Sequence, residues 1–207
     1  MTLLCIEKNL DSTGSGTPSL TSEAAKQSYP LKYPWTMYYD TPNKRTTQEN
    51  YNTNLQALAT VDYVYTACYM IQNIPDASEL PSGTSLSFFR SDIKPSWEDS
   101  HNANGGKWTC SIHKDGSKKI SKLWKDAIFS CIGSEYEHPE TINGVVLSIR
   151  QKTDRIAFWI SDASHDDALK HIASFIKTYL ELPADFTLSF QLHADALKGN
   201  SRDHLIF

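Results

Sequence analysis

The segment VVLSIRQKTDRIAFWI, residues 145–160, indicates the fold class most clearly. Two apolar runs, 145–150 and 156–160, are joined by the polar residues 151–155. Short apolar runs separated by a polar turn are typical of a β-hairpin, in which the two strands are antiparallel. The stretch therefore predicts two neighbouring strands of an antiparallel sheet, with a basic turn between them.

Further strands are predicted on both sides of this hairpin. The segment 31–39 is rich in aromatic residues and predicts a strand, and Pro34 places part of it at the edge of the sheet. A polar stretch with Pro42 predicts a loop at 40–54, and stretches with Pro, Ser and Gly predict loops at 75–83 and 95–106. The other predicted strands are 85–90, 107–113 and 187–193.

Three segments have the periodicity of amphipathic helices. The first begins at Thr60, a candidate N-cap, and extends to Asn73. The last opens at Ser164, with Asp167 at capping-box spacing, and ends before Pro183. The clearest one directly precedes the hairpin, and its apolar stripe must be buried. This stripe consists of Ile120, Leu123, Trp124, Ala127, Ile128 and Cys131.

The elements mix strands and helices without a strict βαβ repeat. They predict an α+β fold in which an antiparallel sheet carries helices on one face. The chain has 207 residues, of which 40% are hydrophobic, and this favours one core and one domain. Because the first 28 residues contain little that would form a core, we expect a disordered tail at 1–28 and a single domain at 29–207.

The charge and the cysteines exclude several classes of protein. The chain has 20 Lys and Arg against 24 Asp and Glu, whereas nonspecific coating of nucleic acid needs a broad basic face. The four cysteines lie far apart, without a CxxC pair or a histidine cluster, so we expect reduced packing residues and no metal or cofactor. No segment is apolar over a membrane-spanning length. We expect a soluble cytoplasmic protein, compatible with a nuclear pool, that binds neither DNA nor membranes.

A tryptophan and a carboxylate stand side by side in the predicted loop at 95–106. Trp97 and Glu98 suit a ligand that is planar, cationic and rich in N–H donors, and a guanine methylated on its imidazole ring has these properties. Tyr51 lies in another polar loop, without an obvious core role, and supplies a second ring. The alternative is that Trp97 anchors its loop in the core and Glu98 is a solvated charge.

Three basic residues gather around the turn of the hairpin: Arg150, Lys152 and Arg155. Arginine presents a fork of donors that matches phosphate oxygens, and lysine supplies a compact charge. The cluster therefore suits a phosphate group. The alternative is a solvated charged turn, which is the usual fate of such residues.

The combination of features that resembles a known family consists of Tyr29-Pro30-Leu31, Trp35, Trp97-Glu98-Asp99, Gly105-Gly106-Lys107-Trp108, Trp124, residues 144–150, residues 156–159 and His193-Ala194-Asp195. It resembles the eukaryotic translation initiation factor 4E family, which binds the cap of messenger RNA. The order and spacing match from residue 29 to residue 195, which makes the resemblance specific. It implies a curved antiparallel sheet with three helices on its convex face and the cap site on its concave face.

The resemblance also implies roles for individual residues. Trp97 and Tyr51 would stack on the two faces of the 7-methylguanine, and Glu98 would bond its Watson–Crick edge. Trp159 would lie near the methyl group. The residues implied to bind the phosphates are Arg150, Arg155, Lys152 and, with weaker support, Lys107.

Position 51 departs from the commonest family members, which have tryptophan there. Tyrosine occupies this position in a divergent class, the cap-binding homologous protein, which often represses translation. The segment 40–51 also resembles that class. Because a phenol is a smaller and less polarisable platform than an indole, we expect weaker cap affinity than in a site with two tryptophans.

Members of the family bind a helical peptide of a scaffold or repressor protein on the convex face, through a valine and a tryptophan of the first helix. The matching residues are Val61 and Tyr65, and Tyr65 lacks the indole N–H donor. Helix-in-groove binding is expected to persist with a changed partner motif. The alternative is that Tyr65 packs in the helix core. The other residues of the implied surface are Tyr29, Pro30, Leu31, Asp126 and Phe129.

We therefore expect a non-enzymatic factor of translation initiation or its regulation that binds capped mRNA and a scaffold or repressor peptide. A second hypothesis is an interaction module that keeps the fold but no longer binds the cap. A third is an enzyme that uses carboxylates such as Asp99 or Asp154. The pattern does not support catalysis, because the histidines are scattered and neither a Gly-rich phosphate loop nor a nucleophile elbow is present.

Overall fold

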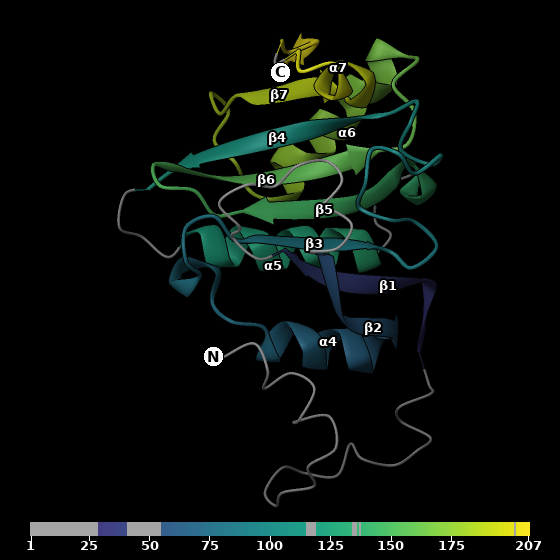
Figure 1. Ribbon diagram of the computed structural model, residues 1–207, viewed down its shortest axis with the longest axis vertical. Helices are drawn as coiled ribbons and strands as arrows, with labels where there is room; N and C mark the ends of the chain where they lie inside the picture. Colours follow the sequence, from purple (N-terminus) through teal and green to yellow (C-terminus); the bar gives the residue numbers. More distant parts are fainter. Residues whose placement is uncertain (1–28, 41–54, 115–118, 134–135, 137, 201) are drawn as a thin grey trace, which may run out of the picture.

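The protein is built around one antiparallel sheet, in a computed structural model that describes residues 29–40, 55–114, 119–133, 136, 138–200 and 202–207 (Figure 1). The strand order is β2-β1-β3-β5-β6-β4-β7-β8. The strands are β1 (Pro30–Asp40), β2 (Leu55–Tyr63), β3 (Ser85–Arg90), β4 (Gly106–His113), β5 (Ile142–Ser148), β6 (Thr153–Ile160), β7 (Leu188–Leu192) and β8 (Leu205–Ile206). The helices are α4 (Val64–Asn73), α5 (Lys119–Gly133), α6 (Asp166–Tyr179) and the short α7 (His193–Leu197), with the 3-10 turns η1 (Ala77–Glu79) and η2 (Pro139–Thr141).

The hairpin predicted at 145–160 lies at the centre of the sheet as β5 and β6. Val145 pairs with Phe158, and Leu147 pairs with Ile156. All four side chains are completely buried, because they point from the sheet toward the helices. β6 begins at Thr153, earlier than predicted, because its first residues also pair with β4. The α+β fold class is confirmed.

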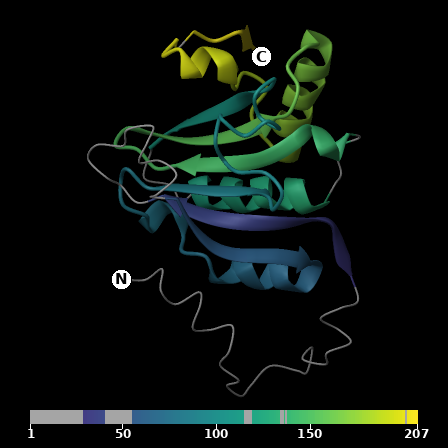
Figure 2. The same ribbon diagram turned by 45° about the vertical axis from the view of Figure 1, so that its right-hand side comes forward.

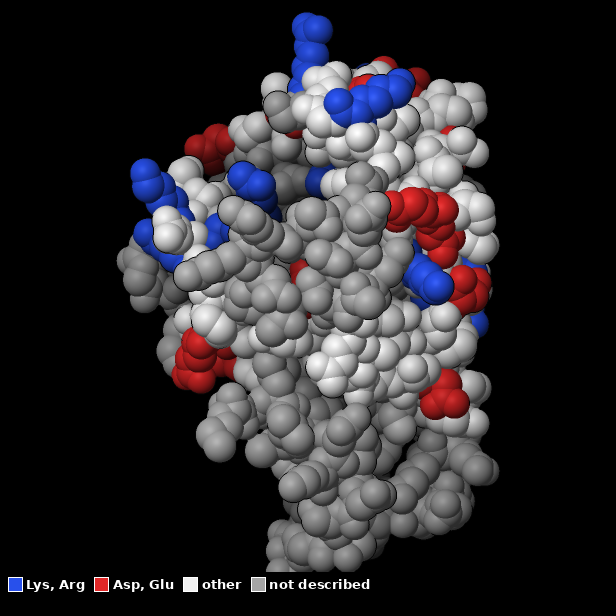
Figure 3. Space-filling model, viewed as in Figure 1, with Lys and Arg blue, Asp and Glu red and all other residues white. Residues whose placement is uncertain are grey.

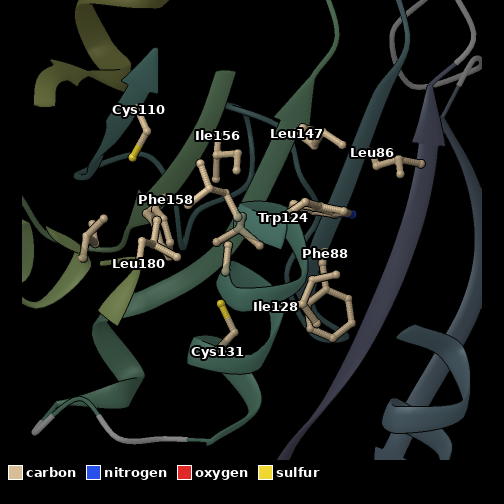
Figure 4. Packing of buried hydrophobic residues seen from close by; sticks show 14 of the residues in the cluster. Leu86, Phe88, Cys110, Trp124, Ile128, Cys131, Leu147, Ile156, Phe158 and Leu180 are labelled. Carbon is tan, nitrogen blue, oxygen red and sulfur yellow. The ribbon is translucent and has the colours of Figure 1, made fainter. Parts of the chain in front are cut away.

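Helices α4, α5 and α6 pack on one face of the sheet. Their buried apolar residues form one cluster with apolar residues of the strands. The stripe predicted for the central helix is buried in α5, and Figure 4 shows Trp124 and Ile128 of this helix beside Phe88 of β3. Figures 1 and 2 show α5 running along the back of the central strands. The prediction of helices on one face of the sheet is therefore confirmed.

The predicted starts of two helices are wrong. Thr60 does not cap a helix, because it pairs with Thr36 in the β1–β2 ladder, and the two hydroxyl oxygens lie 2.9 Å apart. Helix α4 therefore begins only after β2 has ended. Ser164 does not cap α6 either, because its hydroxyl donates to the carboxylate of Asp162 at 2.9 Å, and the helix begins at Asp166.

The outer elements of the sheet were not predicted. Strand β2 overlaps the predicted first helix and exists through its pairing with β1. Strand β8 has only two residues, which pair with Ser189 and Phe190 of β7. The predicted tail at 1–28 lies outside the described residues, as does most of the predicted loop at 40–54.

The cysteines that the structure describes are free thiols. Cys110 and Cys131 are buried, and burial raises the pKa of each thiol to about 12. These two side chains are therefore protonated packing residues. Within the described residues no group of three or more His, Cys, Asp or Glu side chains is placed to hold a metal ion. No helix in this part of the chain is long and apolar enough to cross a membrane.

Candidate functional site

The sheet face opposite the helices carries a second, smaller apolar cluster. Successive residues of a strand point to opposite faces, so Phe88 lies under the helices while Phe89 lies on the other side. We call this side, with Phe89, Ala157 and Trp159, the open face. The cluster on it consists of Phe89, Ile93, Ala157 and Trp159, with Tyr38, Trp97 and Val146 packed against them.

Buried amides fix the loop between β3 and β4 that carries Trp97. The side-chain amide of Asn102 donates to the carbonyl oxygens of Lys94 at 2.9 Å and Ser96 at 2.8 Å. The amide of Asn143 on β5 donates to the side-chain oxygen of Asn102 at 2.9 Å. Both asparagines are at most 1% exposed. Because a broken bond would leave a buried polar group unsatisfied, this network holds the loop in one conformation around Trp97.

Asp99 closes the same loop. Its carboxylate accepts the backbone N–H groups of Lys94 at 2.9 Å and His101 at 3.0 Å. Burial raises the pKa of Asp99, but these bonds, together with the hydrogen bond and charge of the His101 ring, outweigh burial and lower the pKa. Asp99 is therefore an ionised group that holds the loop in place. A carboxylate with a lowered pKa does not suit a role in proton transfer.

Trp97 and Glu98 have different surroundings in this loop. Trp97 is half-buried, and its indole Nε1 has no hydrogen-bond partner among the described residues. Glu98 is exposed, and its carboxylate accepts a hydrogen bond from the Ser96 hydroxyl. The loop thus offers a ring and a carboxylate near the surface.

Trp159 is held between two other rings at the end of β6. Its ring lies edge-on to Phe89, with 5.4 Å between the centroids and 77° between the planes. The ring of His193 lies on it at a centroid distance of 4.1 Å. Lys107 on β4 is its direct cross-strand neighbour. The indole therefore has a fixed position beside a cation.

Lys107 connects the aromatic and basic parts of the open face. Its ammonium nitrogen lies 6.0 Å from the centroid of the Trp97 ring. Burial and, secondly, the nearby charge of Arg155 lower the pKa of Lys107. A bound anion would offset both effects, because it would stabilise the charged form of the amine. The position therefore suits a negatively charged group.

The basic residues around the β5–β6 turn are not equivalent. Arg155 and Lys152 are exposed. Arg150 is also exposed, but its guanidinium donates to the backbone carbonyls of Thr84 at 3.1 Å and Ile149 at 2.9 Å. On the face seen in Figure 3, Lys and Arg side chains gather on the side where this turn lies. The turn thus forms a basic region next to the aromatic cluster.

The structure brings four of the predicted site residues together: Trp97, Lys107, Arg155 and Trp159. On the open face of β6, Arg155 lies near the start of the strand, next to the basic turn, and Trp159 lies near its end. This order suits a planar ring that stacks on Trp97, contacts Trp159 and continues into an anionic tail. Tyr51 lies outside the described residues.

The residues predicted to bind a protein partner lie around α4, α5 and the start of β1. Tyr29 is 72% exposed and Phe129 is 37% exposed, so two large apolar side chains face solvent. Asp126 forms an ion pair with Lys122 at 2.8 Å. The remaining members of this set are the exposed Pro30 and the partly buried Leu31 and Tyr65.

Val61 does not share this surface, because it is only 2% exposed and pairs with Trp35 inside the sheet. Val64 is displayed instead, at 43% exposure, and its backbone N–H donates to the carbonyl of Tyr29 at 2.9 Å. Val64 was not predicted to bind a partner from the sequence, because a helix that begins at Thr60 places it among the apolar residues expected to be buried.

Three buried polar residues support the open face without having been assigned a role from the sequence: Asn102, Asn143 and His193. Residue type alone does not reveal that such a side chain is buried. The one local signal is Asn143-Gly144, which interrupts an apolar strand. In the sequence, His193 stands out only as one residue of the pattern that resembles a known family.

Comparison with known proteins identifies one matching family. The model of the eukaryotic initiation factor 4E family matches residues 30–205. Eukaryotic translation initiation factor 4E1 of Drosophila melanogaster is 28% identical over 169 residues, which are 82% of this chain and 64% of that protein. The chain thus spans slightly less than two thirds of this relative.

Two solved structures have a similar fold. One is the complex of eIF4E-3 of C. elegans with the 4E-binding protein Mextli, with a TM-score of 0.78, 25% identity and coverage of 86% of this chain and 99% of that one. The other is the complex of eIF4E-3 of Ascaris suum with the m7G cap, with a TM-score of 0.78, 25% identity and coverage of 86% and 97%.

Proposed function

Because the chain belongs to the eukaryotic initiation factor 4E family, we propose that it binds the 7-methylguanosine cap of messenger RNA on its open face. It acts there as a binder without catalysis, in translation initiation or its regulation. The solved relative from Ascaris suum is similar over most of the chain and holds an m7G cap.

One observation carries this proposal: the two indoles of Trp97 and Trp159 stand beside the cations Lys107 and Arg155 on the open face. Methylation of guanine leaves a delocalised positive charge, which favours contact with an indole face. The triphosphate that follows is anionic and suits the two basic side chains. The ligand and the site thus match in the same order along the sheet.

The proposal assigns the remaining contacts of the base to the two loops. Glu98, in the fixed β3–β4 loop, accepts the two neighbouring N–H donors of the Watson–Crick edge. Tyr51 covers the base from the side opposite Trp97. Lys152 and Arg150 assist at the phosphates, although the guanidinium of Arg150 is partly engaged with backbone carbonyls.

Titration with 7-methyl-GTP and with GTP, followed by tryptophan fluorescence, tests the proposal. Stacking on Trp97 should quench the emission, and the methylated nucleotide should bind more tightly, because only it carries the charge on the base. Equal affinities would contradict recognition of the methylated base. An absence of quenching by either nucleotide would favour an interaction module that has lost cap binding.

Reversing the charge of Arg155 should weaken binding of the triphosphate selectively. A hydrogen bond to a charged group contributes about 1.5 to 3 kcal/mol, so Arg155→Glu should lower the affinity for 7-methyl-GTP roughly 10- to 100-fold. The affinity for 7-methylguanosine, which has no phosphate, should stay the same. Calorimetric titration of both ligands measures the difference. The control is Lys170→Glu on α6, which reverses an exposed charge elsewhere; equal losses in both variants would reject the assignment.

We also propose that a helical peptide of a scaffold or repressor protein binds around α4 and α5. Tyr29, Val64 and Phe129 supply exposed apolar side chains there. Large exposed apolar side chains on one surface are typical of a protein interface. The relative from C. elegans binds the 4E-binding protein Mextli.

Replacing Phe129 with aspartate should weaken peptide binding strongly and leave cap binding intact. A central apolar contact contributes about 2 kcal/mol or more, which is roughly 30-fold in affinity. Pull-down with an immobilised 4E-binding peptide measures this loss, and Phe129→Leu, which keeps an apolar side chain, is the control. Full peptide binding by the aspartate variant would place the interface elsewhere.

We further propose that the chain belongs with the divergent cap-binding homologous-protein class and works in the cytoplasm, where translation takes place. Tyr51 supports the class, because the class has tyrosine at this position where the commonest members have tryptophan, and the segment 40–51 resembles the class as well. Tyr65 separately stands where family members have a tryptophan on the first helix. Both replacements keep an aromatic ring but lose an indole, so cap and partner contacts are each expected to be weaker.

A further inference from the structure

His193 is a buried histidine that lies where β7 ends, beside the start of β4 and the end of β6. It is completely buried at the start of α7, and its backbone N–H donates to the carbonyl of Gly105 at 3.1 Å. Gly105 in turn lies so close to the end of β6 that an added Cβ would be 1.7 Å from the carbonyl oxygen of Ile160. The backbone that carries His193 is therefore tightly packed against the strand that carries Trp159.

The imidazole of His193 and the ring of Phe89 enclose Trp159. The His193 ring lies at a centroid distance of 4.1 Å and an angle of 39°, which is a tilted stack. Phe89 contacts the same indole edge-on at 5.4 Å. Trp159 itself is only 6% exposed. With both contacts in place, the indole has little freedom to rotate.

Hydrogen bonding does not account for an imidazole at this position. Neither ring nitrogen of His193 has a hydrogen-bond partner among the described residues. A buried polar group without a partner costs free energy, so an apolar ring of similar size would be less costly for folding. Burial and, secondly, the charge of Lys107 lower the pKa of His193 to about 3, so the ring is neutral at physiological pH. The packing contact with Trp159 is what the side chain contributes.

We infer that His193 is a positioning residue, which fixes the indole of Trp159 and through it the discrimination between methylated and unmethylated guanine. The inference rests on the proposed cap binding, together with the expectation from the sequence that Trp159 lies near the methyl group. Without the ring of His193, the indole would turn away from the base. A neutral ring also adds no charge that would repel the cationic base.

Two variants separate positioning from folding. His193→Ala removes the ring, whereas His193→Phe keeps a ring and removes the unpaired nitrogens. Both proteins are labelled with fluorotryptophan, and the signal of Trp159 among the five tryptophans is assigned by its loss in Trp159→Phe. Fluorine NMR reports the surroundings of that indole without any nucleotide. Affinities for 7-methyl-GTP and GTP are measured on the same samples.

We expect the alanine variant to shift and broaden the Trp159 signal and to lower the preference for the methylated nucleotide about tenfold, or roughly 1.4 kcal/mol. The phenylalanine variant should keep most of the preference and be at least as stable as the wild type. A folded alanine variant with unchanged signal and preference would overturn the inference, as would an equal loss of preference in both variants. If the wild type binds neither nucleotide, the proposed function fails, while the fluorine spectra still decide whether His193 positions Trp159.

Discussion

Replacing Trp97 with alanine is expected to abolish retention of the protein on an immobilised 7-methylguanine nucleotide. Stacking of a base on an aromatic side chain contributes about 1 to 3 kcal/mol. A desolvated cation-π contact adds about 2 kcal/mol. Together these contributions correspond to a loss of affinity of roughly 150- to 5000-fold. Retention on the resin and titration with 7-methyl-GTP measure the effect.

The loss should arise at the site and not from unfolding. Trp97 is half-buried at the margin of the small cluster, and its loop is fixed by the side chains of Asn102 and Asn143, which the substitution leaves in place. Trp97→Phe keeps a smaller ring and should lose less affinity. Tyr29→Ala removes an aromatic ring that is 72% exposed beside α4 and should leave retention unchanged. Retention of the Trp97→Ala protein would exclude Trp97 from the site.

The central elements of the fold could be predicted because their local pattern and their tertiary surroundings agree. In α5 the apolar stripe from Ile120 to Cys131 recurs at helical spacing, and its six residues are buried against the sheet. In β5 and β6 the apolar runs are long enough to serve both faces of a central hairpin. Segments whose local preference agrees with their global packing can be predicted from the sequence.

The first helix shows why agreement of this kind is needed. Thr60, Val61 and Val64 match a capped helix, and the same β-branched residues also suit a strand. Pairing with β1 decides the conformation, since it buries Val61 and gives the hydroxyl of Thr60 a partner. That partner strand lies some 25 residues away along the chain, at Trp35 and Thr36, beyond the reach of any local pattern.

The candidate site was predictable in its residue types but not in its register. Trp97 and the basic turn stand out because an indole in a polar loop and a group of cations are unusual. That Lys107 lies opposite Trp159 depends on how β4 and β6 are aligned, and a shift of one residue would send Trp159 to the other face. His193 could not be assigned a role, because only the fold shows that its ring is buried against that indole.

Replacing Trp108 with alanine is expected to destabilise the protein by about 3 to 5 kcal/mol, the range for large-to-small changes at buried aromatic positions. Trp108 is completely buried, on the face of β4 that packs against the helices. Its ring lies 5.1 Å from that of Phe190 on β7. Its indole N–H donates to the carbonyl of Leu169 on α6 at 3.0 Å. Urea denaturation measures the loss, which is a large fraction of the roughly 5 to 15 kcal/mol typical of a domain.

The position of Trp108 also predicts which helix should lose the most protection against hydrogen exchange. Its indole joins β4 to α6 through one buried hydrogen bond, and removing the donor leaves the carbonyl of Leu169 without this partner. Hydrogen exchange should therefore quicken more in α6 than in α4, which packs at the other end of the sheet. Trp108→Phe, which keeps a ring but not the N–H, should cost less and show the same bias toward α6. Equal acceleration in both helices would mean that the tryptophan supports the whole core and does not specifically dock α6.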